Sequence, residues 1–126
     1  MELNGEEHEK TLVAAGNYAN ALAGVNRHAE AKSLMRKMIP VARRVLGEDH
    51  MRTLELRWSY AVALYEDPAA TLDDLREAVT TLEEATPIAR RVLGGAHPQT
   101  GEIEHRLREA RAALRAREKP SPPGQA

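Results

Sequence analysis

The sequence predicts an all-α repeat protein, and three observations support this fold class. The segment 40–50 returns almost unchanged as 87–97. Apolar residues recur at spacings of three and four, which is the period of one helix face. The chain has 42% hydrophobic residues, 3% aromatic residues and no Phe. Its core must therefore be built from aliphatic side chains, a composition that favours closely packed helices over a β-sheet. A length of 126 residues fits a single domain.

The glycines that close the repeats give the repeat length. Gly5, Gly47 and Gly94 are separated by 42 and 47 residues, so the second repeat is longer by five. Segment 17–22 matches 59–64 at the shorter offset, whereas segment 30–31 matches 77–78 at the longer one. The additional residues must therefore lie around 66–74, a stretch with a proline and several turn-forming residues, where a helical repeat tolerates insertion.

Each repeat is predicted to contain two helices. The apolar stripes of the two first helices consist of Leu12, Ala15, Tyr18, Ala19 and Leu22, and of Leu54, Tyr60, Ala61 and Leu64 with Arg57 interrupting. The stripes of the two second helices consist of Ala31, Leu34, Met35, Met38, Ala42 and Val45, and of Ala78, Leu82, Ala85, Ala89 and Val92. These spacings of three and four are those of amphipathic helices.

A fifth helix is predicted after Gly94. It opens at His97 and carries Ile103, Leu107, Ala110 and Leu114 on one face. We therefore expect a helical domain over 1–119, divided into repeats 5–46 and 47–93 and a capping helix over 94–119. Residues 120–126 are rich in proline, and we expect them to be disordered.

The ends of the second helices carry clear signals. Two arginines, as at Arg43 and Arg44, suit the negative end of the helix dipole, and the glycine that follows suits a left-handed cap. Pro40 and Pro87 interrupt these helices at the same repeat phase, where a proline costs about 3 kcal/mol. We predict a kink within one helix, the alternative being two short helices with proline at the start of the second.

Composition and motifs exclude several functions. The formal net charge of −1 gives no overall attraction to nucleic acid or to an anionic membrane, and the absence of Cys removes thiolate chemistry. No apolar run approaches the ~20 residues of a membrane span, and the acidic N-terminus does not resemble a signal peptide. We expect a cytoplasmic protein with no nucleic-acid partner, no membrane partner and no cofactor.

The carboxylate pairs do not suggest an enzyme. Asp73 and Asp74 fall in the predicted turn, and Glu83 and Glu84 fall on a polar helix face. General acid–base catalysis needs a desolvated carboxyl with a second catalytic group close by, and neither pair meets this condition. The sequence also lacks a phosphate-binding glycine loop and a nucleophile elbow.

The junctions between repeats resemble a known family. The segments 46–54 and 93–101, with a weaker copy at 4–12, are similar to the Leu-Gly-x-x-His-Pro-x-Thr-Leu junction of tetratricopeptide repeats of the kinesin light chain type. The small residues Ala19 and Ala61, and the alanines Ala31 and Ala78, match the family pattern. The resemblance covers about residues 5 to 117. The chain departs from it at Glu9 and Met51, which replace the junction proline, at Asn26, which replaces the usual turn glycine, and in lacking a sixth helix.

This resemblance implies a right-handed superhelix whose first helices line a concave groove for an extended peptide. Matching of the phases gives the candidate groove residues Asn17, Asn20, Glu55, Trp58, Ser59, Val62, Tyr65, His105 and Arg106. An amide side chain both donates and accepts, which suits a peptide backbone. Trp58 is the only tryptophan, and an exposed ring would be a typical interface anchor. The alternative is that Trp58 packs beneath a neighbouring helix.

The histidines and the charged ends were also considered as sites. His8, His50 and His97 share one repeat phase, so we expect them at helix starts, a repeat apart, and not around one metal ion. A weak surface metal site at His105 with Glu102 and Glu109 is the less favoured reading. The last helix is basic, with Arg106, Arg108, Arg111, Arg115 and Arg117, whereas the N-terminus is acidic. This polarity suggests either a solvated helix face or a homo-oligomer joined through the terminal helices.

Overall fold

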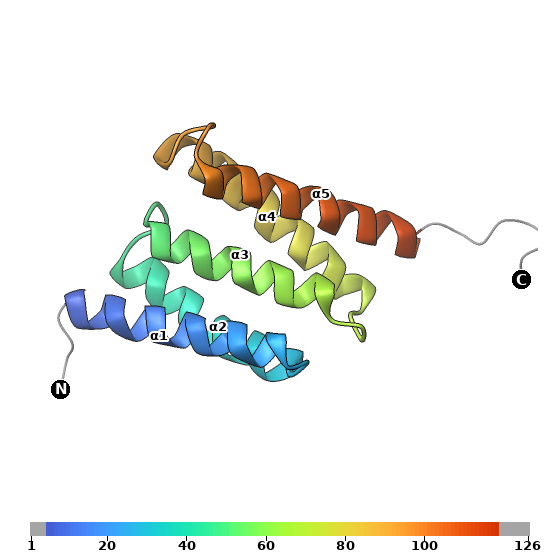
Figure 1. Ribbon diagram of the computed structural model, residues 1–126, viewed down its shortest axis with the longest axis horizontal. Helices are drawn as coiled ribbons and strands as arrows, with labels where there is room; N and C mark the ends of the chain where they lie inside the picture. The colour runs from blue at the N-terminus through green and yellow to red at the C-terminus, as the bar shows by residue number, and fades with distance from the viewer. Residues whose placement is uncertain (1–4, 119–126) are drawn as a thin grey trace, which may run out of the picture.

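The computed structural model describes residues 5–118 and, from residue 8 onward, their side chains. It contains five helices: α1 (Gly5–Gly24), α2 (His28–Val45), α3 (Met51–Glu66), α4 (Leu72–Val92) and α5 (Pro98–Glu118). Figure 1 shows α1, α3 and α5 side by side in one layer, with α2 and α4 behind them. The predicted all-α fold of two helix pairs and a capping helix is therefore confirmed. The segment 120–126, which we expect to be disordered, lies outside the described residues.

Small side chains allow the helices of each pair to approach closely. The four alanines matched to the family pattern, Ala19, Ala31, Ala61 and Ala78, have no solvent exposure. Larger aliphatic side chains fill the space between neighbouring pairs, and the most deeply buried of these are Leu12, Met35, Leu54, Leu64, Leu82 and Ile103. The core is thus continuous from α1 to α5 and contains almost no aromatic side chain.

The ends of α2 and α4 confirm the predicted glycine caps. Gly47 follows the cap residue Leu46 with φ of +97°, and Gly94 follows Leu93 with φ of +94°. The amide of Gly94 donates to the carbonyl of Arg90 at 3.1 Å. Asn26, in the turn between α1 and α2, has φ of +65°. Asparagine tolerates this left-handed conformation better than most residues, which explains how it replaces a turn glycine.

Alanine substitution should change the free energy of unfolding in opposite directions at two glycines, one in a helix cap and one inside a helix. Gly47→Ala should lower the free energy of unfolding by about 1 kcal/mol, because an L residue is strained at φ of +97°. Gly101→Ala should raise it by about 0.5–1 kcal/mol, because Gly101 lies inside α5 and an added Cβ would meet nothing within 4 Å. Urea unfolding of both variants checks the two signs. Stabilisation by both would show that Gly47 is not a left-handed cap.

Helix starts are fixed by side chains that accept backbone hydrogen bonds. His50 Nδ1 accepts from the Arg52 amide at 3.0 Å, and His97 Nδ1 accepts from the Gln99 amide at 3.1 Å. The prediction that these histidines start helices is confirmed. It is wrong for His8, which lies within α1 because this helix already includes Gly5.

The prolines do not divide the second helices. α2 continues through Pro40 and α4 through Pro87, so the alternative of two short helices is wrong. Both prolines are exposed, where the carbonyl groups they leave unpaired can reach water. The Thr86 hydroxyl donates to the Leu82 carbonyl at 2.7 Å, one turn back along the same helix.

Three side chains depart from the predicted apolar stripes, and one of them, Val92 at the end of α4, is 42% exposed. Tyr18 is 58% exposed, because no described helix covers the outer side of α1. Arg57, which interrupts the stripe of α3, is only 2% exposed. Its Nη2 lies 2.9 Å from Glu84 of α4, and its Nη1 lies 3.6 Å from Glu48 of the preceding loop. Burial, and secondarily the nearby Arg43, lower the pKa of Arg57, while the two carboxylates oppose this shift.

Candidate functional site

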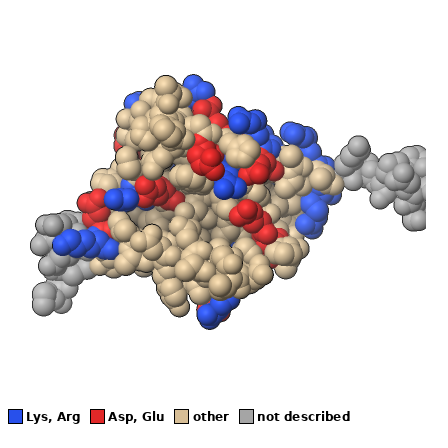
Figure 2. Space-filling model, in the orientation of Figure 1, with Lys and Arg blue, Asp and Glu red and all other residues tan. Residues whose placement is uncertain are grey.

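Residues of three helices line a hollow on the face formed by α1, α3 and α5. Its volume is about 320 Å³, within the range of ligand pockets. Figure 2 shows this face, on which charged side chains border a central depression. The residues that line the hollow are Asn20 of α1, Glu55, Trp58, Ser59 and Val62 of α3, and Arg106 of α5.

Two further hollows extend the first one along α1. The second has a volume of about 70 Å³ and shares Asn20, Glu55 and Ser59 with the first. The third has a volume of about 460 Å³ and shares Asn17 and Arg52 with the second. Because adjoining hollows share their walls, they form one trough that crosses from α1 to α5. We call these three hollows the groove.

Trp58 belongs both to the core and to the groove. It is half-buried, packs against the buried cluster and lines the first hollow. The ring is therefore neither fully exposed nor packed wholly beneath a neighbouring helix, and its role as an anchor stays a prediction. An indole with one supported side and one accessible side is a preorganised apolar surface.

Arg106 is held by acidic and phenolic oxygens at one end of the groove. Its Nε lies 3.0 Å from Glu102, and its Nη1 lies 3.0 Å from Glu109 and 3.9 Å from Glu66. The Tyr65 hydroxyl donates to Glu109 at 2.7 Å and accepts from Arg106 at 3.4 Å. With three carboxylates around one guanidinium, this end of the groove has an excess of negative charge.

The pKa values follow from this arrangement. The hydrogen bond from Tyr65, and then the contact with Arg106, lower the pKa of Glu109. Burial, with the bond to Glu109, raises the pKa of Tyr65. At neutral pH, Glu109 therefore stays ionised and the Tyr65 hydroxyl stays protonated, so the cluster keeps its charges.

Glu55 connects the middle of the groove to both neighbouring segments. Arg52 Nη1 donates to it at 3.0 Å from one turn earlier on α3, and Gln99 Nε2 donates to it at 3.3 Å from the start of α5. The amide side chains of Asn17 and Asn20, in contrast, form no hydrogen bond with other residues among 8–118. These amides can therefore pair with a bound molecule without breaking a contact in the protein.

The structure brings most of the sequence-predicted residues together. Asn20, Glu55, Trp58, Ser59, Val62 and Arg106 line one hollow, and Asn17 lines the adjoining two. Tyr65 lies beside them through its bond with Arg106. His105 lines none of these hollows and is exposed, with Nε2 at 3.7 Å from Glu109.

Sequence reasoning missed three charged residues that line the groove: Glu9, Lys10 and Arg52. Arg52 could have been found, because it lies three residues before Glu55 and such a spacing places both on one helix face. Glu9 and Lys10 could not, because their phase was assigned to the start of a helix, whereas α1 is already helical there.

Other sites considered from the sequence have structural partners. Asp74 completes a capping box with Thr71 at the start of α4. Glu83 binds Arg111 and Glu84 binds Arg57, each at 2.9 Å. Among the described residues, no group of three or more His, Asp or Glu side chains is arranged to hold a metal ion. No helix within 5–118 is both long and apolar enough to cross a membrane.

The comparison with protein families gives one match. Residues 11–50 match the model of the tetratricopeptide repeat, and this range covers most of α1, all of α2 and the loop before α3. Repeats of this family are protein-interaction modules whose stacking creates extended concave surfaces. Neither the curated proteins nor the solved structures include a match to this chain.

Proposed function

We propose that this chain is a non-catalytic protein-binding module that holds an extended peptide segment of a partner protein in the groove. One observation carries the proposal: three helices distant in sequence line a single hollow that contains the only tryptophan. The tetratricopeptide match over 11–50 supports the interaction role in general. The choice of the groove rests on the geometry of its side chains.

The groove suits a peptide main chain better than a compact small molecule. Its three adjoining hollows give an elongated site, and Asn17 and Asn20 offer donors and acceptors at about one helical turn from each other. Trp58 and Val62 supply an apolar surface for one side chain of the peptide. An extended segment can use all three features at once, since its amides and side chains alternate along its length.

The charges indicate the direction in which a peptide would bind. Three carboxylates, those of Glu66, Glu102 and Glu109, surround Arg106 at the α5 end. At the α1 end, Lys10 and Arg52 line the hollow together with one carboxylate, that of Glu9. We therefore expect a preferred ligand with an apolar or aromatic residue over Trp58 and a basic residue towards α5. Complementary charges of this kind fix register and orientation more than they add affinity.

The alternative role, self-association through the terminal helices, receives less support. Arg111 already binds Glu83 of the same chain at 2.9 Å, and Arg117 Nη1 donates to the Ala70 carbonyl at 2.8 Å. Two of the basic side chains that self-association would use are thus already bound to groups of the same chain. For this reason we prefer the groove.

Selection of peptides tests the proposal. Displayed random peptides that bind the immobilised chain should share an aromatic or aliphatic residue and change the emission of Trp58 on binding. Asn20→Ala should weaken a selected peptide by about 1 kcal/mol, roughly fivefold, through the loss of a hydrogen bond.

Thr80→Ala, at an exposed position of α4 outside the groove, is the control and should leave the affinity unchanged. Equal affinities for the wild type and Asn20→Ala, together with unaltered tryptophan emission, would place the peptide elsewhere on the protein.

A further inference from the structure

Four equivalent positions of α3 and α5 are buried against the repeat that precedes each helix. In α3 they are Thr53, Leu56, Tyr60 and Ala63, and in α5, 47 residues later, they are Thr100, Ile103, Leu107 and Ala110. The Thr53 hydroxyl donates to the Ala42 carbonyl of α2, and the Thr100 hydroxyl donates to the Ala89 carbonyl of α4, each at 3.4 Å. The protein thus builds the same interface twice.

The same four positions of α1 are exposed. They are Thr11, Ala14, Tyr18 and Ala21, and the spacing continues to Val25, which is 66% exposed. Beside them, a hollow of about 230 Å³ lies between α1 and α2 and is lined by Tyr18, Leu22, Glu30, Ser33, Leu34 and Lys37. We call the residues Thr11, Ala14, Tyr18, Ala21 and Val25, together with this hollow, the α1 face.

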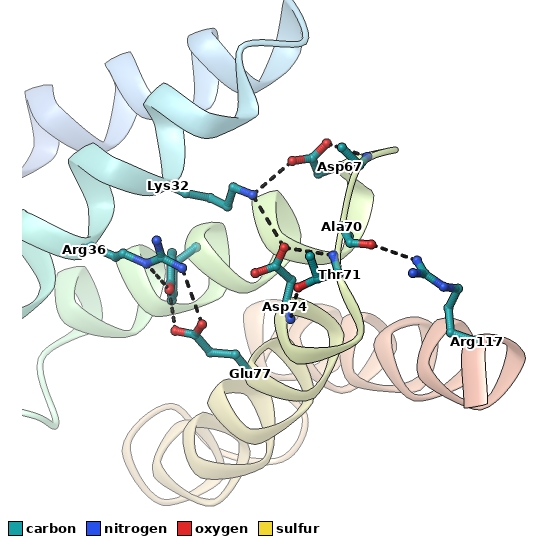
Figure 3. A network of polar contacts seen from close by, with 10 residues as sticks. Lys32, Arg36, Asp67, Ala70, Thr71, Asp74, Glu77 and Arg117 are labelled. Atoms are coloured by element: carbon teal, nitrogen blue, oxygen red, sulfur yellow. Dashed lines mark hydrogen bonds and ion pairs between the residues drawn. The ribbon is translucent and has the colours of Figure 1, made fainter.

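The equivalent interface between α2 and α3 shows which side chains a helix needs in order to pack on the α1 face. Arg36 of α2 donates through Nε to the Tyr60 hydroxyl at 2.7 Å. Figure 3 shows Arg36 beside Glu77, and the Arg36 Nη2 lies 3.5 Å from that carboxylate. The Tyr60 hydroxyl also donates to Glu77. Tyr18 and Glu30 occupy the phases of Tyr60 and Glu77, and both line the hollow of the α1 face.

We propose that the α1 face docks an amphipathic helix of a partner protein that has the pattern of α2. Such a helix carries alanine at the phases of Ala31 and Ala42, apolar side chains at those of the buried Met35 and Ile39, and arginine at that of Arg36. The arginine reaches the Tyr18 hydroxyl and joins Arg27 at Glu30, where Arg27 is bound at 2.5 Å with both side chains about half exposed. This site shares Ala14 with the third hollow of the groove but no residue with the first or second, and it does not depend on the function proposed for the groove.

A second copy of this chain is a poor occupant. The two helices with the required pattern, α2 and α4, have this side covered by α3 and α5 in every copy. The outer side of α5 does not offer the pattern either. Where α3 has Leu54, Ala61 and Leu64 buried beneath α4, α5 has the exposed residues Gly101, Arg108 and Arg111. A helix with the required pattern must therefore come from outside residues 5–118.

A synthetic helix tests the proposal on the full chain. The probe is a labelled peptide with the sequence of residues 27–47, capped at both ends, and its fluorescence anisotropy reports binding. Saturable 1:1 binding is expected. Ala21→Glu should weaken it at least tenfold, because a carboxylate then lies at a position that is buried in both covered interfaces. Asn20→Ala, at an exposed position in the groove, should leave this binding unchanged, so that failure of the groove and failure of the α1 face are distinguished.

A double-mutant cycle tests whether the arginine of the peptide contacts Tyr18 of the protein. Tyr18→Phe in the protein, or Arg36→Leu in the peptide, should each weaken binding several-fold, and the two together should do little more than one. Circular dichroism verifies that the exposed substitutions leave the fold intact. The proposal is overturned if the peptide does not bind, if Ala21→Glu has no effect, or if the free protein is a dimer that Ala21→Glu separates.

Discussion

Trp58→Ala is expected to weaken binding of a groove peptide by at least about 2 kcal/mol, roughly 30-fold. The indole is half-buried and supported by the core, so a ligand gains contact with a surface that is already ordered. Removal of the ring takes away this contact area and enlarges the hollow, which no other described side chain fills. Isothermal titration with a selected peptide measures the loss.

Trp58→Ala should also lower stability, because part of the ring packs against the buried cluster. The titration is therefore done well below the unfolding midpoint, with circular dichroism showing that helix content is retained. Trp58→Phe, which keeps an aromatic ring, is the matched control and should recover most of the affinity. If Trp58→Ala is folded and binds as tightly as the wild type, the anchor role is wrong, and if it cannot fold, Asn20→Ala tests the groove instead.

Leu82→Ala should lower the free energy of unfolding by about 2–5 kcal/mol. Leu82 has no solvent exposure and lies on α4, which packs against both α3 and α5. Its truncation leaves a cavity in a closely packed aliphatic core, which can collapse only in part to fill it. Leu34→Ala removes the same atoms from a half-buried position and should cost less. Guanidinium unfolding compares the two, and equal losses would contradict the assigned helix phase.

Much of the fold could be predicted because the repeat supplies internal evidence. One junction suggests a helix end, but two copies at the same phase also give the repeat length and the position of the insertion. The insertion was placed around 66–74, and in the structure this is the five-residue turn between Glu66 and Leu72 together with the first turn of α4. The caps at Gly47 and Gly94 could be predicted because helix capping depends only on residues that are close in sequence.

The errors occurred where burial depends on an element that the periodicity does not specify. Tyr18 has the same local pattern as Tyr60, yet it is exposed, because a helix like α2 covers only the latter. Arg57 looked like an interruption of an apolar stripe, and its burial depends on Glu84, which lies 27 residues away. His105 was placed in the groove by phase alone and lines none of the three hollows, so its role in binding stays a prediction.

Most of the residues that line the first hollow of the groove could be predicted from the sequence. The phase of the first helices placed Asn20, Trp58, Ser59 and Val62 together, since all first helices turn the same side to one layer. The ion pairs and side-chain hydrogen bonds of the groove were not predictable, because they depend on three-dimensional distances between residues that can be far apart in sequence. Glu55 shows this point, as it is held by both Arg52 and Gln99, and Gln99 belongs to another helix.

The location of a bound peptide tests the central claim most directly. Backbone amide shifts of the isotope-labelled chain can be followed by NMR as a selected peptide is added. We predict the largest changes at Asn17 and Asn20 of α1, at Ser59 and Val62 of α3 and at Arg106 of α5, with the indole signal of Trp58 among them. Changes confined to α2 and α4, with these residues unaffected, would contradict the assignment of the groove as the binding site.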